Sequence, residues 1–182
     1  MDRELAIYVS ASAEMDAECE FIGQLLADIT TTARSVMRRT PRSPEPLNPD
    51  IDALLHSDFY VILLAADLVA PIGVEWSAAR TSGLTSLAYR RTGISPSPAL
   101  SDFFRGADLA WKDYQTPAEF AFEFERDLVS SLLQETPGHG LHLEDVEDLS
   151  QRLDRLSQRQ ADDESPDTRR GAGRGGVILP RP

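Results

Sequence analysis

Cysteine, basic charge and long hydrophobic runs are scarce in this 182-residue sequence, and each scarcity excludes a class of protein. The single Cys19 excludes an internal disulfide framework and a cysteine-based zinc site. No apolar run approaches the ~18 residues that cross a bilayer, and Met1-Asp2-Arg3-Glu4 does not resemble a signal peptide, so we expect a cytoplasmic protein. The formal net charge of −12 opposes binding to nucleic acids and anionic membranes, because both are polyanions.

Composition divides the chain near Thr136-Pro137-Gly138. Residues 1–140 hold 21 acidic and 11 basic side chains together with all seven Phe and both Trp. Residues 141–182 hold no aromatic residue of the Phe, Trp or Tyr type, and 169–182 carry four Arg and no acid. We therefore predict an α/β domain over 1–136, an amphipathic helical extension over 137–160 and a disordered Arg/Gly-containing tail over 161–182.

Apolar runs alternate with helical stripes along the first region, which is typical of an α/β protein. The clearest strand, residues 59–64, carries no charge, as expected where helices cover both faces of a sheet. Strands are expected at 5–9, 33–39, 59–64, 85–91 and 109–111, helices after Ser12 and Pro71 and over 98–105 and 117–134, and an exposed proline-rich loop over 41–49. We predict a three-layer, flavodoxin-like domain whose mostly parallel sheet of four to five strands has helices on both faces.

Motifs for other chemistries are weak. Gly171, Gly173 and Gly176 spell G-x-G-x-x-G, but no predicted strand precedes them and no helix follows, so we expect no dinucleotide site there. His139 and His142 lack a ligand cluster, so no metal site is expected. The absence of a G-x-S-x-G elbow argues against an α/β-hydrolase.

Two predicted strands end in small or acidic residues that would open onto one crevice. The first strand ends at Ser10-Ala11-Ser12 and the central one at Ala65-Ala66-Asp67. Ligands of an open parallel sheet bind beyond the carboxyl ends of its strands, where the strand order reverses. Glu75 lies about one turn into the helix that begins at Pro71, within reach of this crevice. A Glu near a helix start is also favoured by the helix dipole alone.

Three segments together resemble the TIR-like domains of bacterial signalling and defence proteins. The first is Val9-Ser10-Ala11-Ser12 followed by Glu14, Met15 and Asp16. The second joins Ser57-Asp58-Phe59-Tyr60-Val61-Ile62-Leu63-Leu64 to Ala70-Pro71-Ile72-Gly73-Val74-Glu75-Trp76, and the third comprises Trp111, Tyr114 and the helix from Pro117. The resemblance covers residues 5–134, and nucleoside 2-deoxyribosyltransferases share the architecture.

This resemblance implies cleavage of the N-glycosidic bond of NAD or a related nucleotide, with Glu75 as the catalytic carboxylate. NAD would be the substrate, and no cofactor is expected. Departure of nicotinamide needs no general acid, so one carboxylate beside the ribose suffices to stabilise an oxocarbenium-like transition state or to bond it covalently. Ser10, Ala11 and Ser12 would bind the phosphates or ribose and Asp67 would line the crevice. Trp76 would stack on a base or anchor the core.

Two alternatives stay open. A non-catalytic TIR-like module that assembles with itself or with signalling partners predicts a filled crevice and an exposed association face, whereas the glycosidase predicts an open crevice with Glu75 beside Ser10 and Asp67. A deoxyribosyltransferase needs an aromatic pocket and a second acid, for which Asp67 is the nearest candidate.

The C-terminal region carries two apolar features. Val146, Leu149, Leu153 and Leu156 form a two-heptad seam, so residues 146–156 either pack on the domain or form a homo-oligomer. Val177-Ile178-Leu179-Pro180 is a small apolar patch in the Arg-rich end, either a frayed terminus or a short peptide ligand for another protein.

Overall fold

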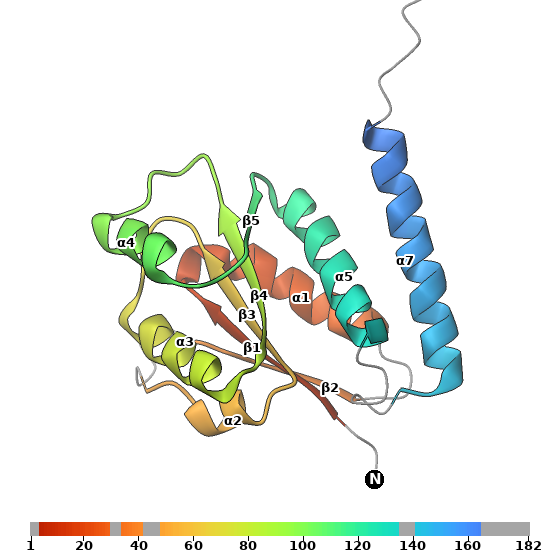
Figure 1. Ribbon diagram of the computed structural model, residues 1–182, viewed down its shortest axis with the longest axis horizontal. Helices are drawn as coiled ribbons and strands as arrows, with labels where there is room; N and C mark the ends of the chain where they lie inside the picture. Colours follow the sequence, from red (N-terminus) through yellow and green to blue (C-terminus); the bar gives the residue numbers. More distant parts are fainter. Residues whose placement is uncertain (1–3, 30–33, 42–47, 135–140, 165–182) are drawn as a thin grey trace, which may run out of the picture.

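The computed structural model, which describes residues 4–29, 34–41, 48–134 and 141–164, has three layers (Figure 1). Five parallel strands form one sheet in the order β2-β1-β3-β4-β5. Their bounds are Glu4–Ala11 for β1, Arg34–Arg39 for β2, Phe59–Leu64 for β3, Thr85–Arg91 for β4 and Trp111–Tyr114 for β5. This is the flavodoxin-like strand order, whose reversal lies between β1 and β3. The predicted fold class is confirmed.

Helices cover both faces of the sheet (Figure 1). One face carries η1 (Ala13–Met15), α1 (Asp16–Ile29), α5 (Pro117–Gln134) and α7 (Leu143–Glu164). The other face carries α2 (Ile51–Leu55), α3 (Ala70–Ser82) and α4 (Pro98–Gly106). None of the described helices is both long and apolar enough to cross a membrane.

Most predicted elements are confirmed, with three corrections. The short helix α2 was not predicted, and the last strand covers 111–114 rather than 109–111. The final helix continues to Glu164, past the expected boundary at residue 160. The proline-rich loop lies mostly outside the described residues, as do Gly171, Gly173, Gly176, His139 and the apolar patch 177–180.

Side chains on alternate positions of β1 build two separate cores, because successive residues of a strand point to opposite faces. Leu5, Ile7 and Val9 pack with α1 and α5, while Tyr8 packs in the core beneath α2, α3 and α4. Ser10 follows Tyr8 on the same face. Polar groups on this face of β1 are therefore directed at α3.

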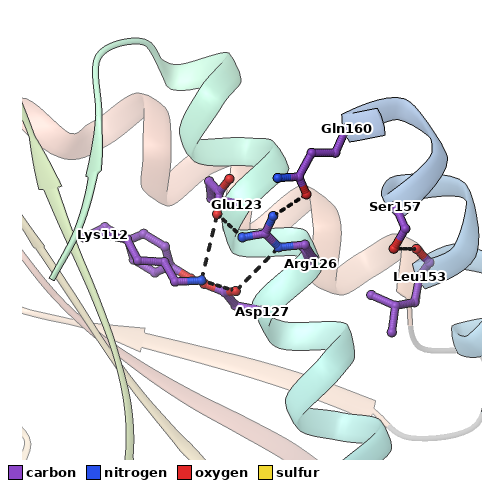
Figure 2. A network of polar contacts seen from close by, with 8 residues as sticks. Lys112, Glu123, Arg126, Asp127, Leu153, Ser157 and Gln160 are labelled. Atoms are coloured by element: carbon purple, nitrogen blue, oxygen red, sulfur yellow. Dashed lines mark hydrogen bonds and ion pairs between the residues drawn. The ribbon is translucent and has the colours of Figure 1, made fainter. Parts of the chain in front are cut away.

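The helix α7 packs on the domain of its own chain. This is the first of the two arrangements expected for the apolar seam of residues 146–156. Leu149 and Leu156 are buried, and Arg152 Nε donates to Glu125 Oε1 of α5 at 2.5 Å. Figure 2 shows the neighbouring polar network, in which Arg126 of α5 donates to Gln160 of α7 at 2.7 Å. In the same network Lys112 of β5 contacts Asp127 at 2.5 Å. The seam lies against α5, where it stabilises the fold of a single copy.

Replacing Leu149 with alanine should lower the free energy of unfolding by about 2–3 kcal/mol, because a buried leucine is exchanged for a cavity. Leu143→Ala on the same helix is the matched control, since Leu143 is 73% exposed and its loss should change stability by less than about 0.5 kcal/mol. Urea denaturation of both variants measures the difference. Equal stability of the two variants would contradict docking of α7 on α5.

Candidate functional site

Glu75 is a buried carboxylate held by three hydroxyl groups. It lies in the second turn of α3 and has no exposed surface. Tyr8 donates its phenolic hydroxyl to Oε1 at 2.8 Å. Ser10 and Thr40 donate theirs to Oε2 at 2.5 Å and 2.7 Å. Both carboxylate oxygens are therefore occupied by side chains of the same domain.

The register of the sheet brings these hydroxyls together. Tyr8 and Ser10 lie two residues apart on β1 and so share one face. The pairing of β1 with β2 places Thr40 beside the end of β1, where Thr40 N donates to Val9 O at 3.0 Å. Thr40 Oγ1 also accepts from Ala11 N at 3.1 Å. Thr40 thus joins the backbone of β1 to the Glu75 carboxylate.

Two aromatic side chains complete the inner wall of this cluster. Tyr60 lies beside Tyr8 in the sheet and stacks on Trp76, with ring centroids 6.2 Å apart. Burial raises the pKa of Tyr8 and of Tyr60 well above the usual range, and the negative charge of Glu75 raises both pKa values further. Both phenols therefore stay protonated at neutral pH, and Tyr8 acts as a donor to Glu75. Trp76 is 9% exposed and is an anchor of the core.

The other predicted site residues are not gathered around Glu75 in the expected way. Asp67 is exposed, accepts from Ser97 Oγ at 2.6 Å and from Leu68 N at 2.8 Å, and the Ser97 hydrogen bond lowers its pKa. Ser12 is 3% exposed, occupies the N-cap position of η1, and its hydroxyl has no hydrogen-bond partner among the described residues. Of the predicted site residues, Ser10 contacts Glu75 directly. Ala11 is linked to Glu75 through the Thr40 hydroxyl, and Trp76 belongs to the cluster through its stacking on Tyr60. The glycosidase alternative expects an open crevice in front of Glu75, whereas this carboxylate has no exposed surface and accepts from Tyr8, Ser10 and Thr40.

The neighbouring strand exits are lined by further carboxylates. Glu14 Oε1 accepts from Ala66 N, just beyond β3, at 3.4 Å. Arg39, at the end of β2, donates to Asp16 at 3.1 Å. Ala66 N and Arg39 Nη1 are therefore engaged by acidic side chains of the chain itself, whereas Arg39 Nε and Nη2 are buried without a hydrogen-bond partner among the described residues.

Sequence reasoning missed a second buried carboxylate on the opposite face of the sheet. Glu18 of α1 has no exposed surface, accepts from Tyr114 Oη at 3.1 Å and lies 3.8 Å from Arg91 Nη1. Its Oε2 has no hydrogen-bond partner within the described part of the chain. The one available signal was its position four residues before the apolar Ile22, on the inner stripe of α1.

Two cavities lined by described residues lie near this region. A groove of about 680 Å³ lies between α2 and α3 and is lined by Ile51, Leu55, Gly73, Val74, Ser77, Ala78, Thr81 and Ser82. A smaller cavity of about 190 Å³ lies beyond the end of β4, between Arg91 and Phe104. Glu75 lines neither one. Among the described residues, no group of three or more His, Cys, Asp or Glu side chains is placed to hold a metal ion.

No family model matches this chain, and no curated protein or solved structure matches it significantly.

Proposed function

We propose that this chain is a non-catalytic, TIR-like signalling module that works by assembly with other copies of itself. The observation that carries this proposal is the state of Glu75, which has no exposed surface and has both oxygens bonded to Tyr8, Ser10 and Thr40. A carboxylate that attacks or stabilises a ribose must reach the sugar. Here it would first have to leave three hydrogen bonds within the core.

The charge at the strand exits supports the same conclusion. The pyrophosphate of NAD is an anion, and Glu14, Asp16 and Asp67 lie where it would enter. Arg39, a cation at the end of β2, already pairs with Asp16 through Nη1, although its Nε and Nη2 have no hydrogen-bond partner among the described residues. Like charges at a binding site oppose association, so a dinucleotide is a poor ligand for this edge.

The association face that this proposal requires is the groove between α2 and α3. It exposes Leu55 and Val74, which are 45% and 55% accessible. Exposed apolar side chains at the edges of a groove are a feature that interaction sites share.

The second candidate function is cleavage of the NAD N-glycosidic bond with Glu75 as the catalytic carboxylate. It is favoured by the Glu75 carboxylate being buried without an ion-pair partner among the described cations, an arrangement that costs stability and that clusters at functional sites. The deoxyribosyltransferase alternative has no such support, because its second acid, Asp67, is exposed and bonded to Ser97.

One experiment tests both candidates on the purified full chain over a wide concentration range. Nicotinamide release from NAD and the mass in solution are measured together for the wild type, Glu75→Gln and the control Glu20→Gln, which changes an exposed position of α1. We expect concentration-dependent self-association of the wild type without nicotinamide release in any oligomeric state.

Two outcomes would contradict the proposal. Nicotinamide release that is abolished in Glu75→Gln and retained in Glu20→Gln would establish the glycosidase instead. A wild type that stays folded, silent and monomeric at every concentration would exclude assembly.

A further inference from the structure

The groove between α2 and α3 is lined by both large apolar and small side chains. Leu55 of α2 and Val74 of α3 are its exposed apolar edges, and Gly73, Ser77 and Ala78 supply small side chains. A Cβ atom built on Gly73 would meet no heavy atom within 4 Å, so the space above this glycine is open. The groove can therefore admit another chain close to the α3 backbone.

The sequence contains a short apolar segment that lies outside the described residues. Val177-Ile178-Leu179-Pro180 lies near the C-terminus, and Arg174 and Arg181 stand on either side of it. The surrounding residues 169–182 hold four Arg and no acid, whereas residues 1–140 hold 21 acidic and 11 basic side chains. This segment has the opposite charge to the domain.

We propose that the α2/α3 groove binds residues 177–180 of another copy of this chain. This inference rests on the assembly function proposed above and names the contact that produces it. Tail and groove are different surfaces, so each copy can bind one neighbour through its groove and another through its tail. Such heterologous pairing gives a ring if it closes and an open-ended chain of copies if it does not.

Size and charge favour this occupant. From Gly73 to Ser82 the groove follows α3 for about 14 Å, at about 1.5 Å per residue. An extended four-residue segment covers about 13 Å. Asp50 and Asp52 are exposed on either side of the groove residue Ile51, where they can receive the arginines that flank the segment. The helix α3 itself carries one exposed cation, Arg80, in its last turn.

The place where α7 ends favours binding between copies over binding within one. Glu164 ends α7 on the face that carries α1 and α5, and the groove lies on the opposite face (Figure 1). Twelve residues, 165–176, separate Glu164 from Val177 and span at most about 43 Å when fully extended. Within one copy they would have to pass around the sheet, whereas a neighbouring copy can be approached directly.

Two full-length variants test this inference by complementation. Ile178→Asp removes the apolar ligand and leaves the groove intact. Gly73→Arg places a long cation into the open space of the groove and leaves the tail intact; Gly73→Ala is its matched control. We expect each of Ile178→Asp and Gly73→Arg alone to be monomeric, Gly73→Ala to assemble like the wild type, and an equimolar mixture of the first two to form a 1:1 dimer in sedimentation velocity experiments.

A labelled peptide of residues 169–182 gives an independent measurement on the Ile178→Asp protein, whose groove is free. We expect saturable binding that weakens at least tenfold when Gly73→Arg is introduced or when the peptide carries Ile178→Asp. A wild type that assembles while Ile178→Asp assembles equally would overturn this inference and leave the assembly proposal standing. Assembly that is lost in Gly73→Arg but retained in Ile178→Asp would point to groove-to-groove pairing and would likewise overturn it. A wild type that stays monomeric would overturn both proposals, even where the peptide binds, because no second copy would then occupy the groove.

Discussion

Replacing Glu75 with alanine is expected to lower the free energy of unfolding by about 4 kcal/mol. The substitution leaves the hydroxyls of Tyr8, Ser10 and Thr40 buried without their acceptor. Each buried donor that loses its partner costs about 1–3 kcal/mol, and the emptied volume adds a cavity term. Glu75→Gln keeps the volume and one oxygen acceptor, so we expect it to cost only about 1–2 kcal/mol.

Denaturant unfolding at neutral pH measures both changes, with Glu20→Ala on the exposed side of α1 as the control. The control should differ from the wild type by less than about 0.5 kcal/mol. Residues that serve catalysis often reduce stability, and their removal then stabilises the fold. A Glu75→Ala variant that is more stable than the wild type would therefore contradict the structural role of Glu75 and favour the glycosidase.

The elements with the strongest sequence patterns are those that the structure confirms. The uncharged run 59–64 is β3, a central strand that is buried along its whole length. The helix predicted to end near Gly83 does so, because Gly83 adopts a φ of 70° and its N–H bonds back to Ala79 O and Arg80 O. The five-residue α2 was missed because a helix of one turn has no measurable periodicity. It is fixed by the Asp50 cap and by packing on α3.

The polar cluster was only partly predictable for a similar reason. Tyr8 could have been found, since it stands two residues before Ser10 on the same strand and must share its face. Thr40 could not, because its position depends on the register between β1 and β2, which no local pattern encodes. The depth of Glu75 likewise depends on the packing of α3 against the sheet. A sequence places a carboxylate near a strand exit, but the tertiary structure decides whether solvent reaches it.

The four tyrosines of this chain are expected to resist ionisation until the domain unfolds in alkali. Tyr8, Tyr60, Tyr89 and Tyr114 are each at most 3% exposed. Burial is the main cause that raises the pKa of each above the usual value. Three of them also donate to carboxylates, namely Glu75, Asp127 and Glu18, which oppose a phenolate.

The sign of the pH dependence follows from these shifts. A group whose pKa is higher in the folded state than in the unfolded chain contributes stability that is intact below the unfolded pKa, about 10 for tyrosine, and that is lost as the pH rises above it. Each buried phenol then removes about 1.4 kcal/mol per pH unit, so the four together remove about 5 kcal/mol per pH unit. Burial also raises the pKa of the Cys19 thiol, which acts in the same direction. A domain of about 10 kcal/mol stability would unfold within about two pH units above pH 10.

Tyrosinate absorbance and far-ultraviolet circular dichroism, followed in one titration, measure this coupling. We expect both signals to change in a single cooperative step, while the urea-unfolded chain titrates near pH 10. Tyr60→Phe is the control variant, because the Tyr60 hydroxyl has no hydrogen-bond partner among the described residues and its loss should leave stability at neutral pH nearly unchanged. It should reduce the alkaline slope by about a quarter, since one phenol of four is removed. Tyrosinate that forms near pH 10 while the circular dichroism stays native would show that solvent reaches at least one phenol in the folded state. If Tyr8→Phe abolished that early signal, the cluster around Glu75 would be open in solution and a ligand could reach its carboxylate.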